Sequence, residues 1–268
     1  MPALAKSFNE DLPQNIEGLI AQYHKALRQI DSLLRESDSS EIERSSVILQ
    51  KTSLLSPIAF PPKIICLGLN YFDHALESKA SVPEEPIFFM KPHTTIIGPN
   101  QPILHPSFVK ALDYEGELAI VIGKKTKNIS ISEAKKRIFG FTIMNDVSAR
   151  EIQFRDGQWT RGKSFDTFAP IGPCIATLDE FEDTGNLTIR TWINNDLRQD
   201  STTRNMVFKV EEIVHHLSRV MTLEPCDIIA TGTPAGVGFA MNPPQFLKSG
   251  DVVRIEIEGI GVLENIVK

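Results

Sequence analysis

The sequence predicts an α+β fold that is rich in β-strands and carries a small N-terminal lobe with one amphipathic helix. Before residue 61 the apolar residues recur at helical spacing, whereas after it they gather in short runs separated by glycine, proline, asparagine and aspartate. These runs do not alternate regularly with long helices, which disfavours a doubly wound parallel sheet. At 268 residues the chain is long enough for one large domain and a small lobe.

The N-terminal lobe is organised around one predicted helix. Apolar side chains recur at three- and four-residue spacing over residues 16–34, and polar residues fill the other face. A polar connection follows at residues 35–46, and the prolines within residues 54–63 mark a boundary near residue 61. We therefore expect a lobe of residues 1–60 and a main body of residues 61–268.

The main body is expected to consist mostly of strands. Seven apolar runs have the composition of strands, at residues 63–69, 86–91, 117–123, 139–145, 188–194, 226–232 and 251–259. Helical patterns interrupt them at residues 71–79, 132–137 and 210–221. In the last of these the apolar residues share one face, which predicts an amphipathic helix.

The composition disfavours two classes of partner. The formal net charge is −6 and the sequence contains no basic block, so we expect no nucleic-acid partner. The apolar stretches are far shorter than the roughly 20 residues of a membrane helix. Acidic residues also stand near the start, where a signal peptide needs an apolar core. We therefore expect a cytoplasmic protein that does not enter a membrane.

The chain contains three cysteines, Cys66, Cys174 and Cys226. Their odd number and wide spacing favour neither a disulfide scaffold nor a zinc site, and they are consistent with a reducing compartment. We expect each to be a small buried hydrophobic residue.

Acidic residues gather where two strands are predicted. Asp113, Glu115 and Glu117 fall on one side of a period-2 pattern with apolar residues on the other. This pattern describes either a half-exposed strand or carboxylates that converge on a hard cation such as Mg²⁺ or Mn²⁺. Asp146 ends an apolar run, and it either caps a helix over residues 147–154 or supplies a further oxygen to the same ion.

His74 and Glu77 are three residues apart in a predicted helix, so their side chains share one face. A carboxylate at this distance can orient an imidazole that acts as a general base on water. The alternative is an exposed pair on a surface helix.

Basic residues are concentrated between Arg150 and Lys163, where four of them outnumber two acidic residues. The segment forms either a pocket for a substrate carboxylate or enolate, or a solvated loop. Lys91 stands at the end of a predicted strand. It is either part of the same pocket or a surface lysine whose ammonium extends to solvent. The glycine-rich residues 231–238 lack the nucleotide-binding patterns, and they form either a turn beside a ligand or a plain loop.

Over about residues 63–268 the chain resembles the fumarylacetoacetate hydrolase superfamily. Six segments occur in the order typical of that family: GLNYFDHALE, FFMKP, DYEGELAIVIG, IMNDVSAREIQ, TRGKSFDTFAPIGP and TGTPAGVG. The resemblance implies a β-rich fold of the family's own type, usually assembled as a homodimer. It also implies one Mg²⁺ or Mn²⁺ held by carboxylates that match Glu115, Glu117 and Asp146.

The same matching extends to residues that act on a substrate. His74 and Glu77 resemble the pair that activates water, and Lys163 resembles a lysine that contacts a substrate oxygen. Three further residues match positions that contact substrate, namely Lys91, Gln153 and Thr233.

Two positions depart from the family pattern. Cys226 stands where a turn glycine commonly precedes Asp227, which affects a turn. His93 stands where a small hydroxyl residue is frequent, and this change could alter the choice of substrate.

The sequence therefore predicts a metal-dependent hydrolase that cleaves a carbon–carbon bond in an acylpyruvate-type 1,3-diketo acid and releases pyruvate and a carboxylic acid. His74, oriented by Glu77, would deprotonate water, while Lys163 would hold the departing enolate. The same residues suit an isomerase, tautomerase or decarboxylase of oxaloacetate or a related 2-oxo or 2-hydroxydienoic diacid. A third alternative is a non-catalytic protein that binds a metal or a dicarboxylate. In the enzymatic alternatives the partner is a small 2-oxo acid.

Overall fold

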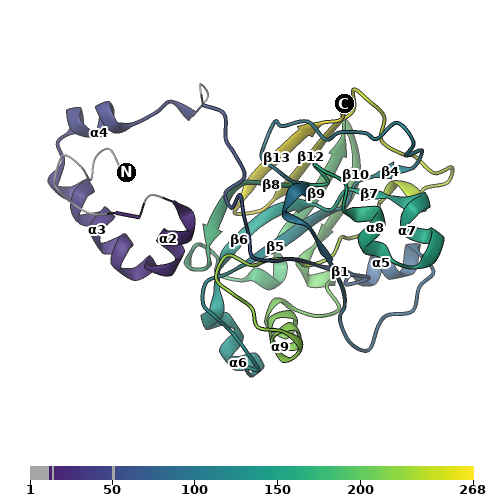
Figure 1. Cartoon of the computed structure of the whole chain (residues 1–268), viewed down its shortest axis with the longest axis horizontal. Coiled ribbons are helices and arrows are strands. Elements are labelled where there is room, and N and C mark those ends of the chain that lie inside the picture. Colours follow the sequence, from purple (N-terminus) through teal and green to yellow (C-terminus); the bar gives the residue numbers. More distant parts are fainter. Residues whose placement is uncertain (1–11, 14, 50–51) are drawn as a thin grey trace. The chain divides into compact units, whose positions relative to one another are not determined.

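The computed structural model describes residues 12–13, 15–49 and 52–268, and the chain divides into two compact units after Ser53 (Figure 1). The first unit contains three helices, α2 (Ile16–Ala21), α3 (Tyr23–Glu36) and α4 (Ser39–Ser45). The long helix predicted over residues 16–34 is therefore wrong in its continuity, because the backbone leaves helical geometry at Gln22, with φ −117° and ψ 24°.

The polar connection expected at residues 35–46 contains helix α4. Asp38 accepts a hydrogen bond from the Glu41 backbone, and the Glu41 side chain accepts one from the Asp38 backbone. This capping box satisfies two amide groups that the first turn leaves unpaired, which explains how so polar a segment becomes helical. Within this unit Leu12 and Leu33 form a small buried cluster against Ile30.

The second unit is built on a mixed seven-stranded sheet. Its strand order is β2-β1-β11-β5-β6-β8-β3. The strands are β1 (Ile64–Gly68), β2 (Ile87–Lys91), β3 (Ile96–Ile97), β5 (Gly116–Ile122), β6 (Ile138–Asn145), β8 (Ala169–Thr177) and β11 (Ile228–Ala230). The pairs β1–β11 and β3–β8 are parallel and the other neighbours are antiparallel. Strands β5 and β6 are buried along their whole length.

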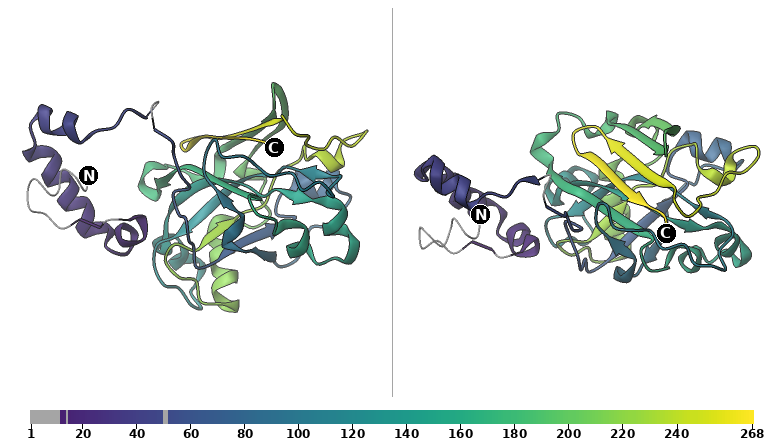
Figure 2. Two further views of the ribbon diagram at one scale, coloured as in Figure 1. Left: turned by 45° about the horizontal axis from the view of Figure 1, so that its top comes forward. Right: turned by 90° about the horizontal axis from the view of Figure 1, so that it is seen from above.

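A four-stranded antiparallel sheet packs against this large sheet (Figures 1 and 2). It has the order β10-β9-β12-β13 and contains β9 (Thr188–Ile193), β10 (Asp196–Thr202), β12 (Val252–Ile257) and β13 (Gly261–Ile266). Strand β9 contacts β5, and β12 contacts β6. The short strands β4 (Leu112–Asp113) and β7 (Ser148–Ala149) pair separately. The core thus lies between two sheets, which places the start of β5 deep in the unit.

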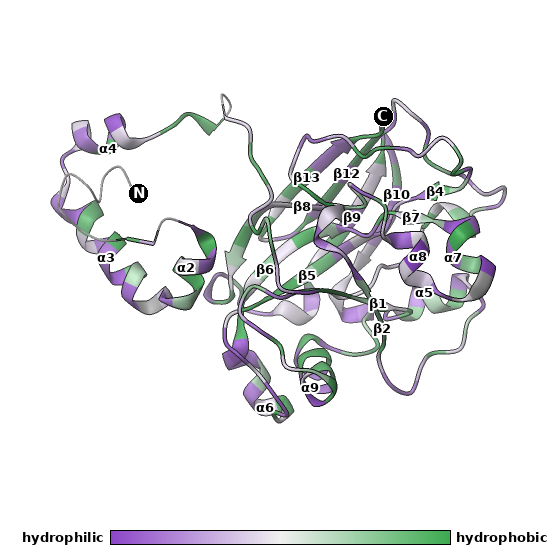
Figure 3. Ribbon diagram, viewed as in Figure 1, coloured by the Kyte–Doolittle hydropathy of each residue, from purple (hydrophilic) through white to green (hydrophobic). Residues whose placement is uncertain are grey.

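Helices gather in two places on the second unit (Figure 1). They are α5 (Phe72–Glu77), α6 (Ile131–Ala134), α7 (Arg150–Asp156), α8 (Trp159–Lys163) and α9 (Val210–Val220). Single 3₁₀ turns occur at η2 (His93–Thr95), η3 (Lys135–Arg137), η4 (Leu178–Glu180), η5 (Thr184–Asn186), η6 (Thr203–Asn205) and η7 (Gly238–Ala240). Helix α9 carries hydrophobic and hydrophilic residues on different sides (Figure 3), and its buried side chains join the main core.

The α+β, strand-rich class is confirmed, and each of the seven predicted runs contains a strand. The sequence did not predict β8, β10 or β13. Pro170 and Pro173 interrupt β8, and prolines usually count against a strand. The sheet accommodates this segment because the register between β6 and β8 shifts between Phe141 and Ile143. Strand β10 is an edge strand with mostly polar residues, so it lacks an apolar pattern.

The cysteines differ in their surroundings. Cys66 and Cys226 are buried as expected, whereas Cys174 is exposed, so the prediction is wrong there. Cys226 has φ 71°, the left-handed conformation that glycine adopts at no steric cost. The departure from the family pattern at Cys226 therefore places a side chain where the turn favours glycine.

Across the described part of the chain, no helix is both long enough and apolar enough to span a bilayer.

We predict that truncating two valines of α9 has different effects on stability, because one is buried and the other is exposed. Val214 is fully buried in α9, whereas Val220 at the end of the same helix is 63% exposed. Val214→Ala should lower the free energy of unfolding by about 2–3 kcal/mol through lost burial and the cavity left behind. Val220→Ala should change it by less than about 0.5 kcal/mol. Urea unfolding of both variants measures this difference, and equal losses would contradict the packing of α9.

Candidate functional site

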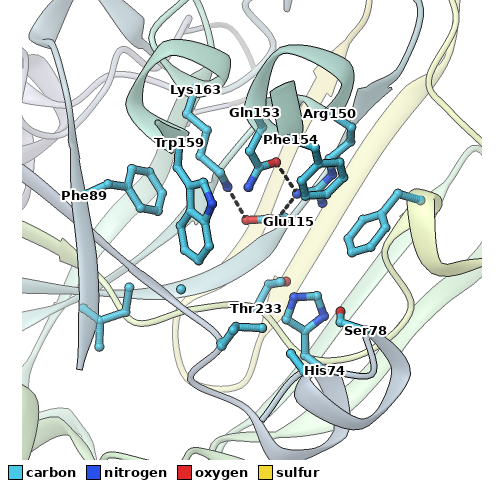
Figure 4. Close-up of a pocket in the computed structure, with 15 residues that line it drawn as sticks. His74, Ser78, Phe89, Glu115, Arg150, Gln153, Phe154, Trp159, Lys163 and Thr233 are labelled. Atoms are coloured by element: carbon cyan, nitrogen blue, oxygen red, sulfur yellow. Dashed lines mark hydrogen bonds and ion pairs between the residues drawn. The ribbon is translucent and has the colours of Figure 1, made fainter. Parts of the chain in front are cut away.

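A cavity of about 260 Å³ lies beside the start of β5 (Figure 4). Its wall comes from β1, β2, the start of β5, helices α5, α7 and α8, and the loop that follows β11. The residues that line it are Leu67, Gly68, Leu69, His74, Ser78, Ala80, Phe89, Glu115, Arg150, Gln153, Phe154, Trp159, Lys163, Thr233 and Phe239.

Three buried carboxylates converge at the floor of this cavity. Glu115 directly precedes β5, Glu117 is its second residue, and Asp146 directly follows the end of β6. Because β5 and β6 are antiparallel, with Gly116 opposite Asn145, the start of one strand lies beside the end of the other. One oxygen from each of the three carboxylates lies within 4.8 Å of the others.

Glu117 shows that this group of acids fits a cation. Its Oε2 accepts a hydrogen bond of 2.8 Å from the Gly232 amide, but its Oε1 is buried without a hydrogen-bond partner. Burial and the nearby Asp146 and Glu115 raise the pKa of Glu117 well above its ordinary value. Three hard oxygen donors around an unpaired buried carboxylate oxygen fit a divalent ion such as Mg²⁺ or Mn²⁺.

Lys163 and Lys91 neutralise part of this negative charge. Lys163 Nζ lies 2.7 Å from Glu115 Oε2 and 2.7 Å from Asp146 Oδ2, and Lys91 Nζ forms an ion pair with Asp146 Oδ1. Burial alone would lower the pKa of Lys163, but Asp146 and Glu115 outweigh it and raise that pKa. Burial likewise favours a higher pKa for Glu115, but Lys163 and Arg150 outweigh it and lower that pKa to about 2.

The balance of charge around the site is negative when every group is ionised. Among the described side chains buried here, four carboxylates face three cations: Asp113, Glu115, Glu117 and Asp146 against Lys91, Arg150 and Lys163. A divalent cation would reverse the sign of this balance. The site would then attract an anionic ligand rather than repel it.

Asp113 holds Arg150 and the loop after β11 in place. Arg150 Nε donates to Asp113 Oδ2 at 2.8 Å, and the amides of Gly238 and Phe239 donate to the same carboxylate at 2.8 and 3.1 Å. Arg150 Nη1 lies 2.6 Å from Glu115 Oε1, whereas Nη2 is buried without a hydrogen-bond partner. Asp113 therefore orients a cation at the cavity wall and lies outside the group that can bind a metal.

His74 and Glu77 form the pair that their spacing predicted. Nδ1 of His74 lies 2.8 Å from Glu77 Oε1, and Glu77 Oε2 accepts a hydrogen bond of 2.9 Å from the Gly236 amide. Both ends of the carboxylate are thereby held, which fixes the orientation of the imidazole. With Nδ1 engaged, Nε2 is the ring nitrogen that can exchange a proton with a ligand. Figure 4 shows His74 across the cavity from Lys163 and Gln153.

Thr233 and Gln153 also line the cavity. Gln199 Nε2 donates to Thr233 Oγ1 at 2.8 Å, and Thr233 Oγ1 donates to the Gly116 carbonyl at 3.0 Å. Gln153 Oε1 accepts a hydrogen bond of 3.0 Å from Arg150 Nη1, which leaves its amide group as a donor.

Eight of the ten predicted site residues line this cavity or supply the carboxylates at its floor. The other two, Glu77 and Lys91, lie behind this lining and contact His74 and Asp146, respectively. The alternatives of a half-exposed acidic strand, a surface His–Glu pair and a solvent-directed Lys91 are wrong, since His74, Glu117 and Lys91 are buried. Asp146 caps no helix, because α7 begins at Arg150. His93 is exposed and does not line the cavity.

The apolar wall of the cavity was not predicted. Trp159 precedes Lys163 by four residues on α8, and Phe154 follows Arg150 by four on α7, so helical spacing could have revealed both. Phe239 has no such sequence pattern. Its ring lies 4.5 Å from the Arg150 guanidinium carbon and edge-on to His74, a contact that only the fold creates.

The chain is similar to known proteins in sequence and in fold. Residues 63–268 match the family model for the fumarylacetoacetate (FAA) hydrolase C-terminal domain. Oxaloacetate tautomerase fahd2, mitochondrial, from Xenopus laevis is 44% identical over 97% of this chain and 80% of that protein.

Two solved structures are also similar. The 2-hydroxyhepta-2,4-diene-1,7-dioate isomerase from Mycobacterium marinum is 46% identical, with a TM-score of 0.70 over 80% of this chain and 76% of that one. Maleylpyruvate hydrolase from Sphingobium sp. SYK-6, solved with manganese(II) and pyruvate, is 31% identical, with a TM-score of 0.78 over 94% and 84%.

We predict that Glu117→Gln stabilises the protein in EDTA but removes stabilisation by Mn²⁺. A raised carboxyl pKa means that the folded state keeps a proton which the unfolded state loses above its ordinary pKa. This penalty on stability increases as pH rises from about 4.5 toward the folded-state pKa, and a neutral amide avoids it. Melting curves at several pH values, with EDTA or with Mn²⁺, measure both effects.

The matched control for this experiment is Glu85→Gln, because Glu85 is exposed. Its melting temperature should match that of the parent in EDTA and rise equally with Mn²⁺. A Glu117→Gln protein that is less stable than the parent in EDTA would show that the buried Glu117 carboxyl does not destabilise the fold. A variant that Mn²⁺ still stabilises as much as the parent would show that Glu117 is not a metal ligand.

Proposed function

The chain belongs to the fumarylacetoacetate hydrolase family, and on that premise we propose that it is a metal-dependent tautomerase of oxaloacetate or a similar short 2-oxo diacid. Its similarity to enzymes argues against a purely non-catalytic binding protein. We further propose that Glu115, Glu117 and Asp146 hold one Mg²⁺ or Mn²⁺.

The choice of a diacid rests on one nitrogen of Arg150. Arg150 lines the cavity, and its Nη2 is buried without a hydrogen-bond partner. The distal carboxylate of a diacid would pair with this nitrogen, whereas the neutral acyl group of an acylpyruvate could offer only a weaker acceptor. The similarity to an oxaloacetate tautomerase over 97% of the chain supports the same choice.

Proton transfer in this proposal depends on residues from opposite walls. A bound divalent ion would act as a Lewis acid toward the oxygens of the 2-oxo acid. His74, held by Glu77, takes the proton from C3 through Nε2, and the electron pair of that bond forms the C2–C3 double bond. Negative charge develops on the C2 oxygen, where the Lys163 ammonium stabilises it. Return of that proton from His74, through water, to the C2 oxygen gives the enol and restores the neutral imidazole, and the reverse sequence gives the keto form.

Carbon–carbon bond hydrolysis of an acylpyruvate is the second candidate, and the His74–Glu77 pair favours it. An imidazole held at 2.8 Å by a carboxylate suits the deprotonation of water as well as of carbon. The name of one solved relative, maleylpyruvate hydrolase, supports a hydrolytic reaction.

We extend the proposal to the assembly and the compartment of the protein. We propose a homodimer, which sedimentation analysis tests directly. We also propose a cytoplasmic location, which imaging of the full chain tests against the mitochondrial location in the name of the Xenopus relative.

We predict that His74→Gln lowers the Mg²⁺-dependent rate of oxaloacetate tautomerisation by about 10²–10⁴-fold, the usual contribution of a positioned general base. The ultraviolet absorbance of the enol follows this rate, and proton NMR of the same samples identifies the products. His216→Gln is the control, because His216 packs against Phe208 in a different part of the unit and should leave the rate unchanged.

Two results would contradict the proposed function. A His74→Gln enzyme with the full rate would remove His74 from the reaction. Release of pyruvate and acetate from acetylpyruvate, with no acceleration of oxaloacetate tautomerisation, would instead assign the protein to the second candidate.

A further inference from the structure

Trp159 closes one end of the cavity against the bare backbone of Gly68. A Cβ atom built on Gly68 would lie only 2.0 Å from Cζ3 and 2.7 Å from Cη2 of the indole. No side chain fits between them, so the contact requires glycine. On another side the indole meets Phe89 edge to face, with ring centroids 5.9 Å apart. Backbone and aromatic ring together fix the position of Trp159.

Helix α8 connects this wall to the charged floor of the cavity. Trp159 and Lys163 are four residues apart on α8 and both line the cavity (Figure 4). Lys163 is tied to Glu115 and Asp146 by two contacts of 2.7 Å. The indole therefore stands at a fixed position relative to the carboxylates that would hold the metal.

The two ends of the cavity differ in chemistry. Arg150 and Gln153 provide hydrogen-bond donors at one end, where the Phe239 ring also packs on the guanidinium, whereas Trp159 and Phe89 form an apolar surface at the other (Figure 4). A carboxylate placed on the apolar surface would lose its hydration without gaining a partner. An alkyl tail placed against Arg150 would leave its Nη2 without a hydrogen-bond partner. Charged and apolar tails are thereby directed to opposite ends.

We propose that Trp159 determines substrate specificity by limiting the length of the apolar tail on a 2-oxo acid bound in this cavity. The indole occupies the space that a longer tail would fill, so the cavity selects short acids. This inference rests on the proposed function only in taking a 2-oxo acid as the ligand. It does not depend on whether the reaction is tautomerisation or hydrolysis.

Binding of a series of ligands tests the proposal. The probes are the straight-chain acids pyruvate, 2-oxobutanoate, 2-oxopentanoate and 2-oxohexanoate, measured by calorimetry with Mg²⁺ present. The parent protein should bind more weakly as the tail lengthens. In Trp159→Ala each added methylene should strengthen binding by about fourfold until the opened space is filled, as expected for apolar burial. Trp159→Phe should give a dependence of binding on tail length between those of the parent and Trp159→Ala. This variant replaces Trp159→Ala in the test if the alanine variant does not fold.

A double-mutant cycle identifies the contact responsible. Gly68→Ala forces the indole to move, and it should weaken pyruvate binding by roughly tenfold, within the range for residues in contact. In the Trp159→Ala background the same change should have less than about a twofold effect, because the colliding ring is absent.

Two results would overturn the inference in distinguishable ways. If folded Trp159→Ala binds pyruvate but keeps the length profile of the parent, Trp159 does not limit the tail. If the parent fails to bind any of the four acids with Mg²⁺ but accelerates oxaloacetate tautomerisation, this inference falls while the proposed function stands.

Discussion

The burial of four carboxylates in one corner of the larger unit is the constraint on which the site depends. Such a group is costly away from water unless every charge is paired, and the three cations beside it leave Oε1 of Glu117 without a hydrogen-bond partner. A divalent ion would satisfy that oxygen and draw Glu115, Glu117 and Asp146 together. The surrounding charges would then favour an anionic ligand. The excess of buried carboxylates over buried cations therefore accounts for metal binding and for the charge of the substrate. It also accounts for the positions of Lys163 and Arg150.

The architecture supplies these groups from segments that are distant in sequence. Antiparallel pairing of β5 with β6 brings carboxylates from two strands together, and helix α8 adds Lys163. Helix α5 contributes the His74–Glu77 pair, and the Gly236 amide holds Glu77 from the loop after β11. Asp113 ties Arg150 to that same loop. Rigid strands thus hold the charged floor, while short helices and one loop carry the side chains that would meet a substrate.

The sequence predicted what local spacing and motif order determine. Every apolar run of strand composition contains a strand, and the pattern of acids at the start of β5 indicated an oxygen-liganded metal. The break at Gln22 and the proline-containing β8 were missed. The apolar spacing continues through Gln22 without a break signal, and a register shift between β6 and β8 accommodates prolines that usually count against a strand. The sequence also could not distinguish the role of Asp113 from that of Glu115. They lie two residues apart, and only the fold shows that Asp113 faces Arg150 and the loop amides.

Anomalous diffraction from crystals soaked in Mn²⁺ tests the central claim most directly. If a divalent ion pairs with the buried carboxylate of Glu117, the anomalous map should show one strong manganese peak per chain. Oxygens of Glu115, Glu117 and Asp146 should coordinate that ion. The same maps should show Glu117 Oε1 directed at the ion. A peak elsewhere on the chain, or none at saturating Mn²⁺, would contradict the claim and leave the buried acids without the cation that explains them.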